Sequence, residues 1–214
     1  EAGPIRARAV VLAAPAAASR PLLAALGGDL AAVAAEDWPT PATIELVTLV
    51  LDAPSLDARP RGSGLLVARD TPGVAAKALT HASAKWDWLA EELPAGRHVV
   101  RLSYGRAGSA NPLAGLDDVA AADLARRDAA LLLGVELDPS QVVGSARVPW
   151  TDALSHAAAG QADRVARLRA ALSASPGVAV AGAWVAGTGL ASVVPDARAA
   201  ALRVIRALDG PVAR

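Results

Sequence analysis

The sequence predicts a mixed α+β protein, in which a sheet-rich middle lies between segments that alternate strand and helix. Short runs rich in Val, Ile and Leu are bounded by Pro and Gly, as strands usually are. Later stretches repeat apolar residues at helical spacing and stop at glycine. With 214 residues, 53% of them hydrophobic, the chain is long enough to bury a sizeable core.

The first half of the chain is predicted to be mainly extended. Residues 5–13 (IRARAVVLA) form a strand, and residues 17–28 form a short helix that ends at Gly27 and Gly28. Residues 42–52 (ATIELVTLVLD) are rich in β-branched side chains and form a second strand. Further extended segments, separated by Pro and Gly signals, are expected at residues 62–70, 73–86 and 97–106.

Helices return in the second half. A helix within residues 116–135 opens at Asp117 and Asp118, whose charge favours a helix N-terminus, and stops at Gly134. A strand is expected next, and then a helix with an apolar face of Val165, Leu168 and Leu172. These two elements and a final short buried strand are predicted at residues 141–150, 160–172 and 177–184.

The last strand leads into the motif GTGLASVVPDARAAALRVIRAL, a Gly-x-Gly turn followed by a helix. Gly187 and Gly189 leave the backbone accessible, and the free N–H groups of a helix N-terminus suit a phosphate or a flavin ring carbonyl. A turn that only redirects the chain would look the same. Because proline is tolerated only in a first helical turn, Pro195 predicts a helix that begins near Val193 or Val194, or kinks there.

Composition excludes several function classes. The 21 basic and 21 acidic side chains balance, so no attraction to nucleic acid or anionic membrane is expected. Cysteine is absent, which rules out disulfides and cysteine nucleophiles, and no apolar run reaches transmembrane length. His81, His98 and His156 are far apart in sequence, so we expect no metal site, and His81 is expected to be a satisfied, half-buried sheet residue. No G-x-S-x-G motif supports a serine hydrolase.

The order of segments resembles the C-terminal part of the FAD-dependent protoporphyrinogen/coproporphyrinogen oxidases of the actinobacterial type. The resemblance covers nearly the whole chain and depends most on LTHASAKW, RLSYGR and the terminal GTGLASVV. VVLAAPAAASRPLLA, GSGLLVARD and GQADRVARLRAAL occur in the same order as in that family.

The resemblance implies an enzyme of heme biosynthesis that oxidises coproporphyrinogen III or protoporphyrinogen IX by hydride transfer to FAD, with dioxygen as the final oxidant. It also implies a substrate-domain sheet with helices, together with the later segments of a split, Rossmann-like FAD-binding domain. On that pattern residues 1–27 and 176–214 belong to the FAD-binding domain, and residues 28–175 form the substrate-binding domain. The implied location is cytoplasmic, with peripheral association at the inner face of the membrane left open.

The same resemblance suggests site residues but no catalytic side chain. Near the isoalloxazine or pyrophosphate of FAD it would place Gly187, Gly189, Leu190 and Val193. Cationic side chains are expected to hold the propionates of the porphyrinogen, because arginine pairs with a carboxylate through two parallel hydrogen bonds. On the segments that resemble the substrate domain, these anchors would be Lys85, Arg101 and Arg106.

The sequence departs from the family in one respect: it lacks the G-x-G-x-x-G strand-turn-helix that cradles the FAD pyrophosphate. We therefore expect a partial enzyme, inactive alone, whose partner is the missing N-terminal half of the same protein. Apolar surfaces at residues 5–13 and 189–208 would then form contacts, including those of a homodimer. The alternative is a free-standing, non-catalytic module that binds a porphyrin or a partner protein.

Overall fold

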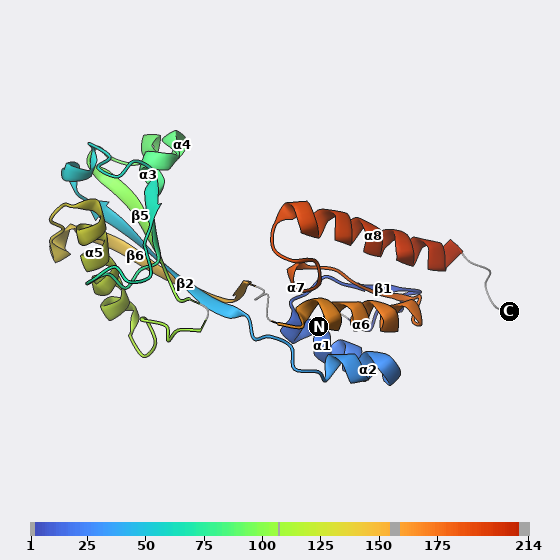
Figure 1. The fold of residues 1–214 in the computed structure, drawn as a ribbon. Coiled ribbons are helices and arrows are strands. Elements are labelled where there is room, and N and C mark those ends of the chain that lie inside the picture. Colours follow the sequence, from blue (N-terminus) through green and yellow to red (C-terminus); the bar gives the residue numbers. More distant parts are fainter. Residues whose placement is uncertain (1–2, 107, 155–158, 210–214) are drawn as a thin grey trace. The chain divides into compact units, whose positions relative to one another are not determined.

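The computed structural model describes residues 3–106, 108–154 and 159–209, which fold into two compact units (Figure 1). Unit 1 is formed by the described parts of residues 1–41 and 154–214, and unit 2 by residues 42–153. The predicted mixed α+β class is confirmed. The division differs from the predicted boundaries at 27/28 and 175/176, because the segments 28–41 and 161–173 pack on unit 1 and not on the central sheet.

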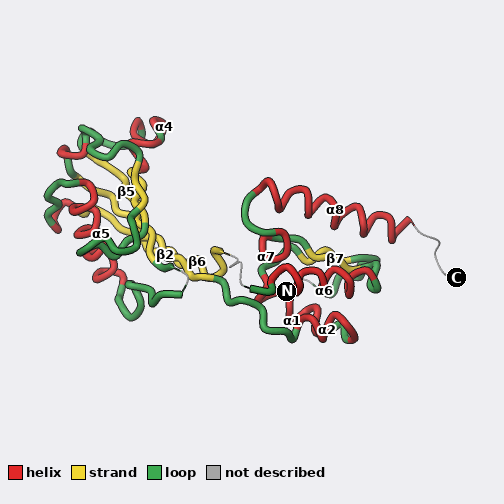
Figure 2. Tube along the Cα trace, viewed as in Figure 1, coloured by secondary structure: helices red, strands yellow, loops and turns green. Residues whose placement is uncertain are grey.

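Unit 2 is built on a five-stranded sheet in the order β3-β4-β5-β2-β6 (Figures 1 and 2). The β2–β5, β4–β5 and β3–β4 pairs are antiparallel. The strands are β2 (Ala42–Asp52), β3 (Gly64–Leu66), β4 (Ala78–His81), β5 (Arg97–Tyr104) and β6 (Val142–Leu154). Its helical elements are η1 (Pro54–Leu56), α3 (Ala82–Lys85), α4 (Asp87–Glu91), α5 (Asp118–Leu133) and η2 (Pro139–Gln141).

The core of unit 2 lies between this sheet and α5. Alternate residues of the two central strands face it, including Leu49, Val100 and Leu102, each of which is fully buried. Helix α5 presents buried alanines, among them Ala121 and Ala125, so its backbone can approach the sheet closely. The apolar face formed by alternate strand residues therefore packs against the apolar face of the helix.

The predicted limits of α5 are confirmed. The Asp117 carboxylate accepts a hydrogen bond of 2.8 Å from the N–H of Ala120 and caps the N-terminus. At the other end Gly134 adopts the left-handed conformation, with φ of 70°, and its N–H bonds the carbonyl of Ala130.

A buried carboxylate on α5 joins the helix to two other parts of unit 2. Asp128 is 1% exposed and accepts hydrogen bonds from the N–H groups of Ala75 and Ala76, the latter at 2.8 Å. It also accepts a hydrogen bond of 3.1 Å from the hydroxyl of Tyr104. Burial, followed by the charge of Asp128, raises the pKa of the Tyr104 phenol. The contacts supply the partners that a buried charge requires, and they fix the chain that leads into β4.

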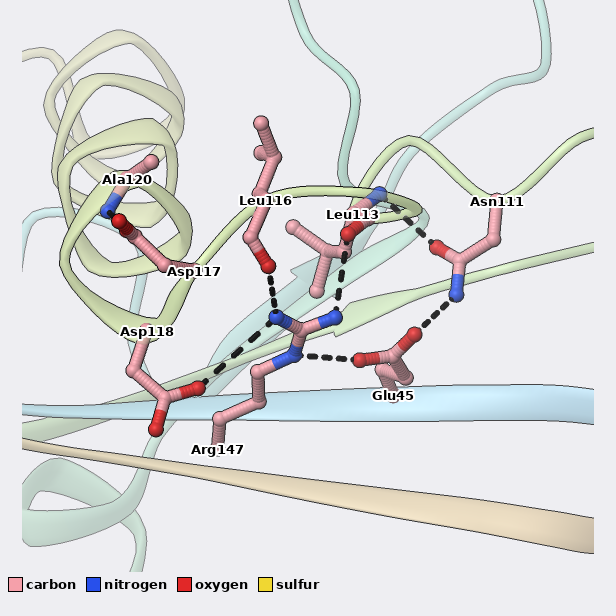
Figure 3. A network of polar contacts seen from close by, with 8 residues as sticks. All are labelled: Glu45, Asn111, Leu113, Leu116, Asp117, Asp118, Ala120 and Arg147. Atoms are coloured by element: carbon pink, nitrogen blue, oxygen red, sulfur yellow. Dashed lines mark hydrogen bonds and ion pairs between the residues drawn. The ribbon is translucent and has the colours of Figure 1, made fainter.

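A second polar network, centred on Arg147 of β6, holds the loop that precedes α5 (Figure 3). Arg147 Nε donates to Glu45 of β2 at 2.6 Å, while its Nη1 and Nη2 donate to the carbonyls of Leu116 and Leu113 at 2.6 and 3.1 Å. The Asn111 amide donates to the other Glu45 oxygen. One guanidinium thus satisfies a largely buried carboxylate and two loop carbonyls together.

Unit 1 is a pair of parallel strands with helices on both faces (Figure 1). Strands β1 (Val10–Leu12) and β7 (Val178–Val180) pair in register from Val10↔Val178 to Leu12↔Val180. One apolar cluster joins the strands to α1 (Ala16–Ala25), α2 (Gly28–Ala34), α6 (Gln161–Ser173) and α7 (Ala183–Ala186). A second cluster joins them to α8 (Leu190–Asp209).

Three local predictions differ from the structure. Strand pairing in segment 5–13 is limited to Val10–Leu12, and segment 73–86 ends in the helix α3. Helix α8 begins at Leu190, because the N–H groups of Ser192 and Val193 already bond the carbonyl of Gly189. Pro195 therefore lies inside the helix, where it cannot donate the usual hydrogen bond to residue 191.

The tryptophans differ in exposure. Trp88 and Trp150 are 64% and 57% exposed, whereas Trp38 and Trp184 form the aromatic part of the unit 1 core with ring centroids 5.0 Å apart. Within the described residues, every helix is too short or too polar to cross a membrane.

We predict that Arg147→Met destabilises the protein by about 2–4 kcal/mol, because it removes the only cationic partner of the Glu45 carboxylate within the described residues and leaves two loop carbonyls without their donor. Urea unfolding at pH 7 measures this change. The double variant Glu45→Gln/Arg147→Met should recover part of the loss, since the uncompensated charge is then gone. Equal stability of the single variant and the wild type would contradict the role given to the network.

Candidate functional site

The predicted cofactor residues lie in unit 1, in the turn between α7 and α8 and in the first turn of α8. Gly187 and Gly189 have φ of 87° and 103°, a backbone conformation that side chains rarely adopt. A Cβ on either glycine would meet no atom within 4 Å, so the backbone is open on that side. Leu190 is 80% exposed and Val193 is half-buried.

This geometry fits part of a flavin site. The first N–H groups of a 20-residue helix carry the positive end of its dipole, and here no side chain separates them from a ligand. Exposed Leu190 adds an apolar surface beside the polar one. The turn can therefore hold a carbonyl-bearing ring or a phosphate at one point, while other contacts must come from residues elsewhere.

Of the predicted anchors, Arg101 lies at the middle of the sheet in unit 2. It is in register with Thr48 of β2 on one side and Thr80 of β4 on the other. Its neighbours Val100 and Leu102 point into the core, so Arg101 lies on the face away from α5 and is exposed. An exposed arginine flanked by two threonine hydroxyls is a suitable place for a carboxylate.

Lys85 and Arg106 lie at opposite ends of β5. Lys85 ends α3, which is attached to the start of β5 by the hydrogen bond from the N–H of Val99 to the Ser83 hydroxyl. Its ammonium lies 4.8 Å from the ring centroid of Trp86. Arg106 follows the far end of β5, roughly 20 Å away at about 3.3 Å per residue, and donates to the carbonyl of Val67 at 2.8 Å. The structure does not bring the three anchors together.

The structure does bring together two histidines that are distant in sequence. His81 Nε2 lies 3.1 Å from His98 Nδ1, and His98 Nε2 lies 2.9 Å from a carboxylate oxygen of Asp57. His81 is fully buried, not half-buried as predicted, and its Nδ1 has no partner among the described residues. The expectation of a satisfied histidine is therefore wrong. His156 lies outside the described residues.

The carboxylate determines the direction of this chain of hydrogen bonds. Asp57 can only accept, so His98 donates through Nε2–H and its Nδ1 accepts from His81 Nε2–H. Burial, and then the nearby His98 and Arg59, lower the pKa of His81 to about 4. The same His98 Nδ1 lies 3.5 Å from the Ser83 hydroxyl, which accepts the N–H of Val99. Because His81 already occupies that nitrogen, the arrangement fastens α3 to the sheet and does not activate Ser83.

Sequence reasoning missed this cluster because it judged the histidines by their separation along the chain. The alternation of RHVVRLSY places His98 on the same side of its strand as Val100 and Leu102, which was a usable signal. The pairing of His81 with Val100 brings the two histidines together, and register of this kind is set by the sheet.

Comparisons with known proteins relate this chain to flavoenzymes. The family model described as flavin containing amine oxidoreductase matches residues 1–208. The chain belongs to this family. Coproporphyrinogen III oxidases of Mycobacterium tuberculosis and Mycobacterium bovis are 39% identical to it over 167 residues, which cover 78% of this chain and 34% of theirs. The Mycobacterium leprae protein of the same name is 36% identical over 166 residues.

Solved structures show a similar fold. A protein from Exiguobacterium sp. 255-15, assigned as a protoporphyrinogen oxidase, has a TM-score of 0.71 at 25% identity and covers 97% of this chain and 42% of its own. Reduced UDP-galactopyranose mutase shares the fold, with a TM-score of 0.61 at 11% identity over 86% of this chain. The chain spans about a third of the length of its mycobacterial relatives, and the resemblance recognised in the sequence is confirmed.

We predict that the free energy of unfolding falls as the pH is lowered from 6.5 towards 4. The folded-state pKa of His81 is about 4, so between these pH values the unfolded chain binds more protons than the folded chain. Lowering the pH therefore favours the unfolded state. The loss is on the order of 3 kcal/mol and is absent above pH 6.5.

Urea unfolding at several pH values measures this slope. His81→Gln is the matched control, because its amide can still donate to His98 but does not titrate in this range. The slope between pH 6.5 and 4 should be shallower in this variant. Identical slopes in variant and wild type would contradict a titrating His81.

Proposed function

We propose that this chain is the C-terminal portion of an FAD-dependent porphyrinogen oxidase of heme biosynthesis. The observation that carries the proposal is the 39% identity to coproporphyrinogen III oxidases over 78% of the chain. Coproporphyrinogen III, converted to coproporphyrin III, is therefore the favoured substrate, and protoporphyrinogen IX is the second. FAD would accept a hydride from the macrocycle, and dioxygen would reoxidise the reduced flavin.

In this proposal the protein's own residues bind and orient both molecules. The open turn at Gly187 and Gly189 and the first N–H groups of α8 would hold the flavin, with Leu190 and Val193 as apolar contacts. Arg101, exposed between two threonines, would pair with a propionate, and Lys85 and Arg106 would hold others. No side chain is required as an acid or base for hydride transfer itself, so positioning is the main task of this chain.

The remainder of the FAD-binding domain is proposed to come from the N-terminal half of the same enzyme. In its described residues unit 1 contains two parallel strands, and it exposes apolar side chains on β1 and α8, including Val10, Val11 and Ile205. Apolar surface of this kind normally contacts another protein segment. A homodimer through the same residues is the competing arrangement. We propose a cytoplasmic location for the assembled enzyme.

The test of the proposal is to produce the chain together with the N-terminal half of a mycobacterial relative and measure flavin and activity. We expect FAD in the gel-filtration peak and formation of fluorescent coproporphyrin III from coproporphyrinogen III. Flavin without oxidation of either porphyrinogen would exclude the substrate. Failure of the peak to retain FAD would exclude the proposed cofactor role.

We predict that Gly189→Ala lowers FAD retention by this complex at least tenfold, because a side chain at φ of 103° strains or displaces the turn at the flavin. Gly62→Ala is the matched control, since Gly62 also has a positive φ, of 58°, and also faces open space, but it lies in unit 2. Equal retention by the two variants would contradict the assigned flavin turn.

We predict that Arg101→Gln raises the KM for coproporphyrinogen III by about 10–100-fold with little change in kcat, since a charge-assisted hydrogen bond contributes about 1.5–3 kcal/mol. Steady-state kinetics of the assembled enzyme measure this effect. Arg206→Gln, at an exposed position of α8, should leave KM unchanged. A fall in kcat alone would contradict a role in binding the substrate.

A further inference from the structure

Two cationic side chains lie close together near the end of β5 in unit 2. The main chain of Val67 connects them, because its N–H donates to the carbonyl of Lys77 at 2.9 Å and its carbonyl accepts from Arg106 Nη2 at 2.8 Å. The ammonium of Lys77 has no hydrogen bond or ion pair among the described residues. Arg106 is held only by the Val67 carbonyl, within the same described part of the chain.

The backbone on both sides of the pair is fixed without any ligand. The N–H of Lys77 donates to the carbonyl of Ser103 at 2.8 Å, and the Asp128 carboxylate accepts the N–H groups of Ala75 and Ala76. On the other strand Gly105 has φ of 86°, and an added Cβ would lie 2.4 Å from the carbonyl oxygen of Thr43. Only glycine fits this turn, which directs the chain from β5 to Arg106. A site whose backbone is ordered in advance loses little entropy on binding.

Several half-buried cations of the protein differ from this pair. Contacts with carboxylates neutralise the half-buried guanidinium groups of Arg97, Arg126, Arg147 and Arg169. Half-buried Arg20 and Arg164 donate to main-chain carbonyls, and Arg203 contacts no carboxylate among the described residues. Lys77 and Arg106 are also half-buried, but among the described residues neither contacts a carboxylate. Asp128, the buried acid nearby, is occupied by the N–H groups of Ala75 and Ala76 and by Tyr104.

The electrostatics follow from this arrangement. Burial, and then the positive charge of Arg106, lower the pKa of the Lys77 ammonium. Two like charges without a counter-ion are unfavourable to hold together, and an anion between them removes that cost. A carboxylate is the appropriate size and charge, since arginine donates to it through parallel hydrogen bonds and lysine adds a point charge.

We propose that Lys77 and Arg106 together bind one carboxylate group of the substrate. The inference rests on the proposed function for the identity of that carboxylate, a propionate of the porphyrinogen, and gives Arg106 a partner that the sequence did not suggest. A small free dicarboxylate would offer the same chemistry. The site is distinct from Arg101, which lies among threonines on the exposed face of the sheet.

The chain contains only two lysines, Lys77 and Lys85, which makes the proposal directly testable. In protein labelled with [13C]lysine, two side-chain Cε resonances report the two pKa values by NMR. We expect coproporphyrin III and glutarate, added separately, to raise the pKa of Lys77 by about 1 unit or more, the effect of an opposite charge within a few ångströms. The matched control is Arg106→Met, which should reduce the response of Lys77 to both probes, while Lys85 is followed separately in the same spectrum.

The outcomes separate this site from the proposed function. If glutarate shifts Lys77 and coproporphyrin III does not bind, the carboxylate site stands and the porphyrinogen assignment fails. If coproporphyrin III binds, as its fluorescence shows, while Lys77 is unmoved, the proposed function stands and this site is overturned. Equal shifts of Lys77 in the wild type and in Arg106→Met with glutarate, or no shift of Lys77 with either probe, also overturn it.

Discussion

The architecture of unit 2 depends on the hydrogen bonds that the buried carboxylate of Asp128 accepts. It lies on α5, at 1% exposure, and receives the Ala75 and Ala76 N–H groups and the Tyr104 hydroxyl. One charge therefore joins the helix, the strand β5 and the chain entering β4. Lys77 comes directly after the two amides that Asp128 holds. The contact between α5 and the sheet thus also fixes the backbone next to Lys77.

The two units differ in what stabilises them. In unit 2, polar networks around Asp128 and Arg147 join the loops to a continuous apolar core. Unit 1 has two smaller apolar clusters on either side of a two-stranded parallel sheet, and several large apolar residues of β1 and α8 remain exposed. The exposed apolar residues are consistent with the proposal that further segments contact unit 1. The chain covers 34% of the length of its M. tuberculosis relatives.

Much of the secondary structure could be predicted because its causes are local. Strand β2 was predicted with its observed limits, and helix α5 between its Asp117 cap and Gly134. The start of α8 was not predicted correctly. Pro195 indicated a start near Val193 or Val194, whereas the N–H groups of Ser192 and Val193 already bond the carbonyl of Gly189.

The family, the fold class and the turn before α8 could be predicted from the sequence alone, because motif order, alternation and glycine placement are properties of residues that are neighbours in the chain. Which polar groups contact one another depends on the tertiary fold. Strand register placed His81 against His98, and the main chain of Val67 connected Lys77 with Arg106. The His81–His98 and Val67–Arg106 contacts join residues 17 and 39 positions apart, and they depend on how strands align in the sheet and not on any local preference.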